Sequence, residues 1–374
     1  MITAVIDTSA LFPDCTLTGV RAQMLLRWSG RGSYDFAIPE VVVLELVHDA
    51  RERLQTAKQR VEKAERICAE LEVDANASSI NVDAGIEQVE KNLRNRIRQA
   101  GGTIPPIPTP EHRELVDRSI RGQKPFNRPS QGSREASDRG YRDTLIWISA
   151  RELAAAGRRV VLVTKNTGDF AHEGQLHPDL VRDVTQASGG LVELCLSLDE
   201  FLKDHLPVDA DVLEAIQELL ADDEAFRDAA REFVRPSLKD AAIDRRSRVD
   251  FARAANTSDD SSYSPEAVTI SDNKILSVQA VDAYGFDDDS VGAIELKITA
   301  ELTADLVFAR PDAEWLAHLG SEVEFEDWDS IETAVAGYTT VKVVATGDLL
   351  LDKGSHTLVD FDVVAVSNVA GDDP

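Results

Sequence analysis

The spacing of the apolar residues changes near residue 265, and this change limits the possible folds of the chain more than any other feature. Before residue 265, short apolar runs of the kind found in buried strands alternate with segments of helical spacing. Such alternation predicts a parallel sheet with helices on both faces. After residue 265, apolar and polar residues alternate with a period of two, and glycines separate the runs. This second pattern predicts an antiparallel β domain.

Each part of the chain contains four predicted strands. Those of the α/β part are Thr3–Ile6, Phe36–Pro39, Arg159–Thr164 and Leu191–Leu196. Those of the β part are Ile275–Val281, Ala293–Val307, Thr339–Ala345 and Leu358–Val366. We therefore expect an α/β domain over residues 1–205, a helical connector over 206–255 and a β-rich domain over 256–374, with a polar linker at 257–265.

The α/β part contains a long insertion, at about residues 50–140. A helix can run from Val41 to about Leu71, and its apolar residues recur every seven positions, which predicts a hairpin with a second helix at Ile86–Ile97. A Gly/Pro-rich stretch then begins at Gly101, and we expect irregular structure to about residue 140. An amphipathic helix is predicted after it, over Thr144–Ala156.

The chain has a formal net charge of −27, which normally argues against a nucleic-acid partner. Most of this charge lies in residues 256–374, which hold 25 acidic and 5 basic residues. By contrast, residues 113–142 hold eight basic and four acidic residues, a local net charge of +4. This basic loop is either a solvated segment of mixed charge or a phosphate-binding surface. In the second case Arg121, Lys124, Arg128 and Arg142 would hold phosphates.

Other features of the sequence indicate a cytoplasmic protein. No apolar run approaches the roughly 18 residues needed to span a membrane, and the N-terminus lacks the basic start of a signal peptide. Cys15, Cys68 and Cys195 are scattered and odd in number, so they predict neither a disulfide framework nor a zinc site.

Four acidic residues stand at the ends or starts of predicted elements in the α/β part. Asp7 and Asp169 follow strands, whereas Glu45 and Asp143 lie near the starts of helices. Ligands of open parallel sheets bind at the carboxyl edge of the strands, so all four side chains can converge there. Each alone has a structural alternative as a helix cap, a turn residue or a surface acid, and Glu40 competes with Glu45.

Convergent carboxylates repel one another unless a cation compensates their charge. Hard oxygen ligands suit Mg²⁺ or Mn²⁺, and such ions assist the hydrolysis of phosphodiesters. A haloacid dehalogenase-like phosphatase would instead need a second Asp two residues after Asp7, where the chain has Ser9. The four acids therefore predict a metal-dependent hydrolase of phosphodiester bonds.

Four motifs around these acids occur in the order found in the PIN domain family, and the chain resembles that family over about residues 1–205. They are Ala4-Val-Ile-Asp-Thr-Ser-Ala-Leu11, Ile38-Pro-Glu-Val-Val-Val-Leu-Glu-Leu46, Gly140-Tyr-Arg-Asp-Thr-Leu-Ile-Trp147 and Val163-Thr-Lys-Asn-Thr-Gly-Asp-Phe170. The third motif, with Lys124-Pro-Phe126 upstream, is closest to a poorly characterised PIN-like branch with extra C-terminal sequence.

The resemblance implies a three-layer α/β/α sandwich and a Mg²⁺- or Mn²⁺-dependent nuclease that most often acts on RNA. It assigns metal binding to Asp7, Glu45, Asp143 and Asp169, and support of the metal site to Thr8, Ser9, Thr164 and Asn166. The chain departs from the small PIN toxins in the long stretch between Glu45 and Asp143 and in its acidic β domain.

Three functional hypotheses follow. The first is an endoribonuclease, and the second is a DNA-directed nuclease for flaps or single strands. The third is a catalytically silent scaffold whose acidic β domain recruits a basic partner protein. In either nuclease, the acidic domain can block the basic loop until a regulatory partner displaces it. The oligomeric state stays open, with a homodimer as one candidate.

Overall fold

The computed structural model describes residues 2–31, 34–71, 73, 80–126, 140–187, 190–239, 267–286, 291–309, 333–352, 355 and 357–368. The chain forms two compact units, Met1–Leu206 and Pro207–Pro374. The expected polar linker at 257–265 lies outside the described residues. Within the parts that the structure describes, each helix is too short or too polar to cross a lipid bilayer.

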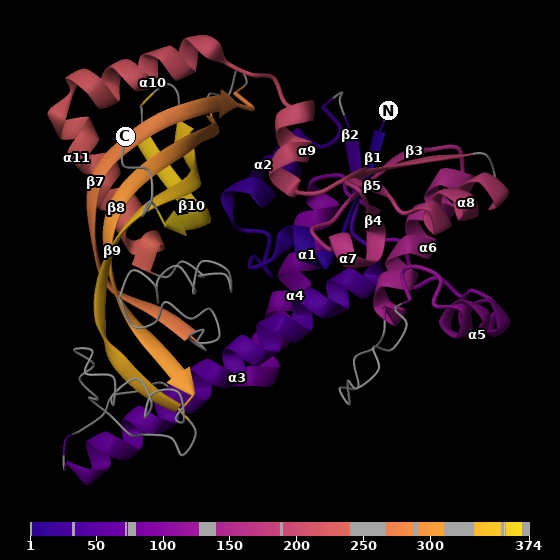
Figure 1. Ribbon diagram of the computed structural model, residues 1–374, viewed down its shortest axis with the longest axis horizontal. Helices are drawn as coiled ribbons and strands as arrows, with labels where there is room; N and C mark the ends of the chain where they lie inside the picture. The colour runs from indigo at the N-terminus through magenta and orange to yellow at the C-terminus, as the bar shows by residue number, and fades with distance from the viewer. Residues whose placement is uncertain are drawn as a thin grey trace. The chain divides into compact units, whose positions relative to one another are not determined.

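The first unit is built on a four-stranded parallel sheet with the order β2-β1-β3-β6 (Figure 1). Its strands are β1 (Ile2–Ile6), β2 (Tyr34–Ala37), β3 (Arg159–Val163) and β6 (Leu191–Cys195). The first group of helices is α1 (Thr8–Leu11), α2 (Val20–Trp28), α3 (Glu40–Glu70), α4 (Val82–Gln99) and α5 (His112–Arg121). The remaining elements are α6 (Tyr141–Ala155), α7 (Thr167–Phe170), the short hairpin β4 (Ala171–His172) and β5 (Gln175–Leu176), α8 (Pro178–Ala187) and α9 (Leu198–His205).

Both faces of this sheet are covered. The four consecutive residues Val160–Val163 of β3 are all buried, and neighbouring side chains of a strand point to opposite faces. Helix α6 packs on β3 and β6, α8 contacts α6 and β6, and α9 contacts β6 and α2. The predicted parallel α/β fold is therefore confirmed.

Helix α6 differs from the amphipathic helix predicted over Thr144–Ala156. All seven residues from Thr144 to Ala150 are buried, so this part of the helix has no solvent-facing side. The physical reason is that α6 lies among the sheet, α3 and α8, which together surround it. The polar groups of α6 bond within the fold: Ser149 Oγ, for example, donates to the carbonyl of Leu145 at 3.0 Å. Such burial fixes the position of the helix start, where Asp143 lies.

Helices α3 and α4 form the predicted hairpin (Figure 1). Helix α3 has 31 residues and so a length of about 46 Å. A close contact joins the two helices, because a Cβ atom at Gly85 would lie 3.1 Å from Leu54 Cδ1. The buried side chains of α3 are confined to its first part, Val41–Ala50, which packs on the body of the unit.

Helix α5 lies within the stretch that the prolines and glycines predict to be irregular. It ends at Gly122, whose φ of +57° is left-handed and suits glycine. Its large apolar side chains Val116 and Ile120 are exposed, so no buried apolar stripe marks the helix in the sequence. Instead, the buried side chain of α5 is that of Arg118, which is 4% exposed.

The second unit is a four-stranded antiparallel sheet with two helices, as its period-two pattern predicts (Figure 1). The strand order is β10-β9-β8-β7, with β7 (Ala267–Tyr284), β8 (Val291–Ala309), β9 (Thr333–Asp352) and β10 (Thr357–Asn368). Helices α10 (Ala210–Asp222) and α11 (Glu224–Lys239) occupy much of the expected connector 206–255. They pack on β7, and α11 also contacts β10, so the core of this unit includes both helices.

Candidate functional site

Asp7 is the most buried carboxylate of the candidate site. It follows β1 directly, and its backbone N–H donates to the carbonyl of Val163 on β3 at 3.0 Å. The side chain is 3% exposed and accepts hydrogen bonds from Ser9 Oγ and from Thr164 Oγ1, the latter at 2.6 Å. Burial raises the pKa of Asp7, although these hydroxyl groups and nearby backbone N–H groups act in the opposite direction. A bound cation would therefore stabilise the ionised form.

Glu45 projects from α3 toward the residues that follow β1. Thr8 Oγ1 donates to Glu45 Oε2, and Arg142 Nη1 lies 2.9 Å from Glu45 Oε1. The competing candidate Glu40 is held elsewhere, because Arg94 on α4 binds its two oxygens with both terminal nitrogens. Arg94 accordingly lowers the pKa of Glu40. The structure thus gives Glu40 a role in the α3–α4 contact.

Asp143 and Asp169 are connected through one amide. Asn166 Nδ2 donates to Asp143 Oδ1 at 3.0 Å and to Asp169 Oδ2 at 2.9 Å. The backbone N–H of Asn166 in turn donates to Thr164 Oγ1 at 3.0 Å. Thr164 therefore contacts both Asp7 and the segment that carries Asn166. These bonds link three of the four acids into one polar cluster.

The carboxylates meet at a cavity of about 420 Å³. Asp7, Glu45 and Asp143 line it, and they come from three separate elements of the fold. Asp169 does not line the cavity and reaches it through Asn166, which does. The remaining lining residues are Thr8, Ser9, Phe12, Asp49 and Arg142.

Asp49 and Phe12 are lining residues that the sequence patterns did not indicate. Asp49 lies four residues after Glu45 on α3, and such spacing places two side chains on one helix face. This spacing was therefore a readable signal. Phe12 carried no comparable signal, because its exposure depends on how the residues after α1 fold.

Three of the four proposed phosphate-binding residues are described by the structure. Arg142 contacts Glu45, and Lys124 Nζ lies 3.4 Å from Asp169 Oδ1 and donates to the carbonyl of Gly168 at 2.6 Å. Arg121 is exposed at the end of α5. Arg128 lies outside the described residues. Two basic side chains therefore each contact one of the acids.

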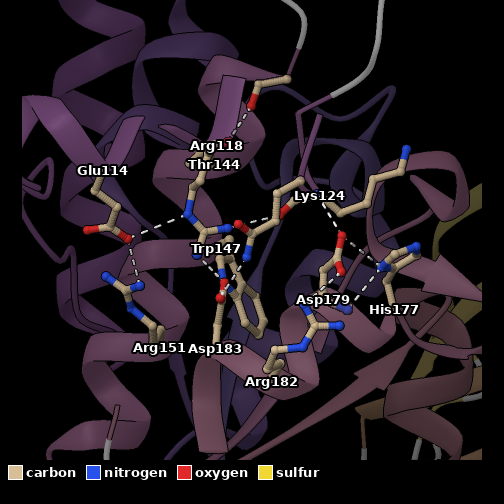
Figure 2. A network of polar contacts seen from close by, with 12 residues as sticks. Glu114, Arg118, Lys124, Thr144, Trp147, Arg151, His177, Asp179, Arg182 and Asp183 are labelled. Carbon is tan, nitrogen blue, oxygen red and sulfur yellow. Dashed lines mark hydrogen bonds and ion pairs between the residues drawn. The ribbon is translucent and has the colours of Figure 1, made fainter. Parts of the chain in front are cut away.

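Figure 2 shows the polar network that fixes the backbone of Lys124. Arg118 forms an ion pair with Asp183 on α8, and both side chains are buried. Trp147 Nε1 on α6 also donates to Asp183, at 3.1 Å. Arg118 Nη1 then donates to the carbonyl oxygen of Lys124 at 3.0 Å. Arg118 is one of the basic residues counted in the segment 113–142. Because it is buried, it holds Asp183 and the backbone of Lys124 in place and does not face solvent.

The segment after Lys124 also touches the start of α6. Gly140 has a φ of +85°, a left-handed conformation that favours glycine. A Cβ atom at this position would lie 2.3 Å from the carbonyl oxygen of Pro125. Lys124 and Asp143 are therefore held near one close backbone contact, which any side chain at residue 140 would disrupt.

The donor set fits Mg²⁺ or Mn²⁺ in its chemistry. All candidate ligands are carboxylate oxygens, which these hard cations prefer, and Asp7 is a buried acid whose ionised form needs compensation. Among the described residues, no three Asp, Glu, His or Cys side chains are grouped closely enough to form a ready metal site. Oxygen atoms of these candidate ligands already have partners in the protein, because the amide of Asn166 bonds to Asp143 and Asp169 and Arg142 pairs with Glu45.

Comparisons with known proteins identify one relationship. Residues 5–170 match a family model described as a PIN domain. These residues contain all four acids of the candidate site and end at Phe170, the last residue of α7. Neither the curated proteins nor the solved structures include a match to the chain.

Proposed function

Because residues 5–170 make the N-terminal unit a PIN domain, we propose that the protein is a divalent-metal-dependent endonuclease, with RNA as the favoured substrate. PIN domains are commonly metal-dependent nucleases. The observation that carries the proposal is the cavity lined by Asp7, Glu45 and Asp143. Three carboxylates from three elements meet there at the carboxyl edge of the sheet, where α/β folds bind ligands.

In this proposal Asp7, Glu45, Asp143 and Asp169 hold one or two Mg²⁺ or Mn²⁺ ions. When bound, such an ion activates water as a nucleophile and neutralises charge on the phosphoryl oxygens. Thr8, Ser9, Thr164 and Asn166 orient the carboxylates through the hydrogen bonds described above. Such supporting bonds commonly contribute about 10- to 100-fold to metal affinity or activity.

Arg142 and Lys124 have two roles in the proposed cycle. Without metal, they partly compensate the charge of Glu45 and Asp169. With a metal ion bound at the carboxylates, Arg142 and Lys124 would be available to bind the phosphates of the substrate. Arg121 and Arg128 would extend this phosphate-binding surface, and the affinity would fall as the salt concentration rises.

The experiment is cleavage of labelled RNA and DNA oligonucleotides in Mn²⁺, in Mg²⁺ and in chelator. The wild type is compared with Asp143→Asn and with the control Asp211→Asn, which changes an exposed acid of the second unit. We expect metal-dependent cutting that Asp143→Asn loses and Asp211→Asn keeps. If all three proteins leave every substrate intact while Mn²⁺ binds, the nuclease proposal is wrong and the silent-scaffold hypothesis is favoured.

The acidic second unit is proposed to regulate this activity. Residues 256–374 carry a net charge of −20, so the unit can compete with nucleic acid for basic side chains or recruit a basic partner. Removal of Pro207–Pro374 takes away the sheet together with α10 and α11, which share its core. We expect this truncated protein to cut faster at low salt than the full chain. Equal or lower activity of a folded truncated protein would remove the regulatory role.

A further inference from the structure

A second cavity, of about 440 Å³, adjoins the carboxylate cavity along α3. The two cavities share Phe12 and Asp49 as lining residues. Beyond these two, the second cavity is lined by Arg53, Thr56 and Arg60, together with Glu52 and Ala57. A substrate strand bound at the carboxylates can therefore continue into this second cavity without leaving the surface of the protein.

Phe12 is placed as a stacking platform between the two cavities. It is 56% exposed, although the preceding Leu11 is buried. The guanidinium carbon of Arg53 lies 5.9 Å from the centre of the Phe12 ring, and Arg53 Nη2 donates to the carbonyl of Pro13 at 2.7 Å. Arg53 thus contacts both the Phe12 ring and the backbone of the next residue, while more than half of the Phe12 surface stays exposed. Unpaired bases stack on such rings, whereas paired bases are already stacked in a duplex.

The charges that line the second cavity change from acidic to basic along α3, starting from the end nearer the carboxylates. Asp49 and Glu52 lie at the end that adjoins the carboxylates, and Glu52 Oε1 is 3.4 Å from His48 Nε2. Arg53 and Arg60 lie seven residues apart, which places them on one helix face about 10 Å from each other along the axis. The cavity is therefore acidic toward the proposed metal and basic farther from it, so its attraction for phosphate is strongest near Arg53 and Arg60.

We propose that this second cavity binds an unpaired nucleotide next to the cleaved bond. The base stacks on Phe12, and Arg53 and Arg60 contact phosphates of the same strand. This inference rests on the proposed nuclease function and specifies its substrate, because it selects single strands over duplexes. Stacking does not depend on the sugar, so unpaired RNA and unpaired DNA should both use the cavity.

The test measures binding separately from cutting. Fluorescence anisotropy follows single-stranded and duplex oligonucleotides of RNA and of DNA, with the full-length Asp143→Asn protein as the background. Adding Phe12→Ala is expected to weaken single-strand binding roughly 10- to 100-fold and to leave duplex binding unchanged, whereas Phe12→Trp should keep the wild-type preference. Phe12→Ala that binds single strands as the parent does, or that loses both forms equally, overturns the proposal.

Arg60 provides a second, independent variant. Arg60→Gln should reduce the slope of log K against log salt for single strands by about 1. The matched control is Lys58→Gln, which removes a cation of α3 that pairs with Glu62 and does not line the cavity. Equal slopes for Arg60→Gln and Lys58→Gln overturn the phosphate contact.

Cleavage by the wild type separates this inference from the proposed function. With the Asp143 carboxylate intact, Phe12→Ala should raise the KM for single strands and leave kcat unchanged. If the wild type never cuts but Phe12→Ala still abolishes the single-strand preference, the proposed nucleotide-binding cavity is supported and the proposed nuclease function is wrong. If the wild type cuts and Phe12→Ala changes neither KM nor binding, the proposed nuclease function is supported and the proposed nucleotide-binding cavity is wrong.

Discussion

The guanidinium of Arg142 lies 2.9 Å from the carboxylate of Glu45, within the cavity that Asp7 and Asp143 also line. A cationic side chain therefore contacts an oxygen that would bind a metal ion in the proposed site. Arg142 is a half-exposed residue on the first turn of α6, so its side chain can leave without disturbing the core. Metal binding and the position of Arg142 should consequently be coupled.

Arg142→Gln should tighten Mn²⁺ binding and weaken substrate binding. The variant removes a competing cation from Glu45, so we expect the Mn²⁺ dissociation constant to fall a few-fold, in line with about 1 kcal/mol for an exposed ion pair. Titration calorimetry measures the metal, and the KM for oligonucleotides measures the substrate. Arg182→Gln is a suitable control, because Arg182 pairs with Asp179 outside the cavity. Weaker Mn²⁺ binding by Arg142→Gln alone would contradict the competition.

Asp7→Asn should abolish activity and stabilise the metal-free protein. Because burial raises the pKa of Asp7 in the fold, folding stability is lost as the pH rises above the unfolded value of about 3.9. The neutral amide avoids this loss, and each kcal/mol gained raises Tm by about 2–4 °C in a unit of this size. Thermal unfolding in chelator should therefore show Asp7→Asn above the wild type at pH 7, with the gap closing toward pH 4.

Mn²⁺ supplies the control for this prediction. It should raise the Tm of the wild type and leave that of Asp7→Asn nearly unchanged, because the variant lacks the buried ligand. A metal-free Asp7→Asn protein that unfolds below the wild type at neutral pH would show that the ionised carboxylate is already well compensated.

Glu40→Gln should lower stability and spare activity. Arg94 lowers the pKa of Glu40, so the pair stabilises the fold above the unfolded Glu pKa of about 4.3, and this stabilisation is lost as the pH falls through the folded value. We expect a loss of about 1 kcal/mol at pH 7 that vanishes at low pH. Denaturant titrations at several pH values measure it. Glu45→Gln is the contrasting variant, for which activity should be lost instead.

Asp183→Asn should destabilise the first unit more than any of these changes. It removes the buried carboxylate that pairs with Arg118 and leaves Glu114, 3.5 Å from Arg118 Nε, as the remaining acidic partner. Breaking a buried pair in this way costs about 3–5 kcal/mol. Because Arg118 also holds the carbonyl of Lys124, substrate binding should weaken in the protein that still folds. Denaturant unfolding gives the first quantity and oligonucleotide anisotropy the second. The exposed Asp117→Asn on α5 is the control.

The sequence predicted the sheet and the meeting of the acids for a physical reason. Parallel strands end at one edge, so Asp7 and Asp169 could be placed from the strands they follow. Helix starts at the same edge explain why Glu45 and Asp143 could be added. What separates Glu45 from Glu40 is the position of Arg94 on α4, which is a contact across 54 residues of chain. No local pattern contains that contact.

Three other features could not be predicted from the sequence, because they depend on which side chains the fold buries or exposes. Arg118 looked like one more cation of a basic loop, but Asp183 and Trp147 make it a buried residue of the fold. The sequence showed no base-stacking aromatic motif, and Phe12 becomes a candidate only because it is exposed and lines both cavities. Helix α6 looked amphipathic because it contains polar residues, but Thr144 and Ser149 donate to backbone carbonyls and are buried with the apolar ones.

The contact between Gly140 and the carbonyl of Pro125 brings two distant points of the chain together. Gly140 and the Pro125–Phe126 backbone therefore lie side by side, although residues 127–139 separate them in the sequence. The position of Lys124 relative to Asp143 is thus tied to a contact in which the neighbouring residue 140 has no side chain. A larger residue at position 140 should therefore move the basic side of the site away from the acidic side, although neither Lys124 nor Asp143 is itself changed.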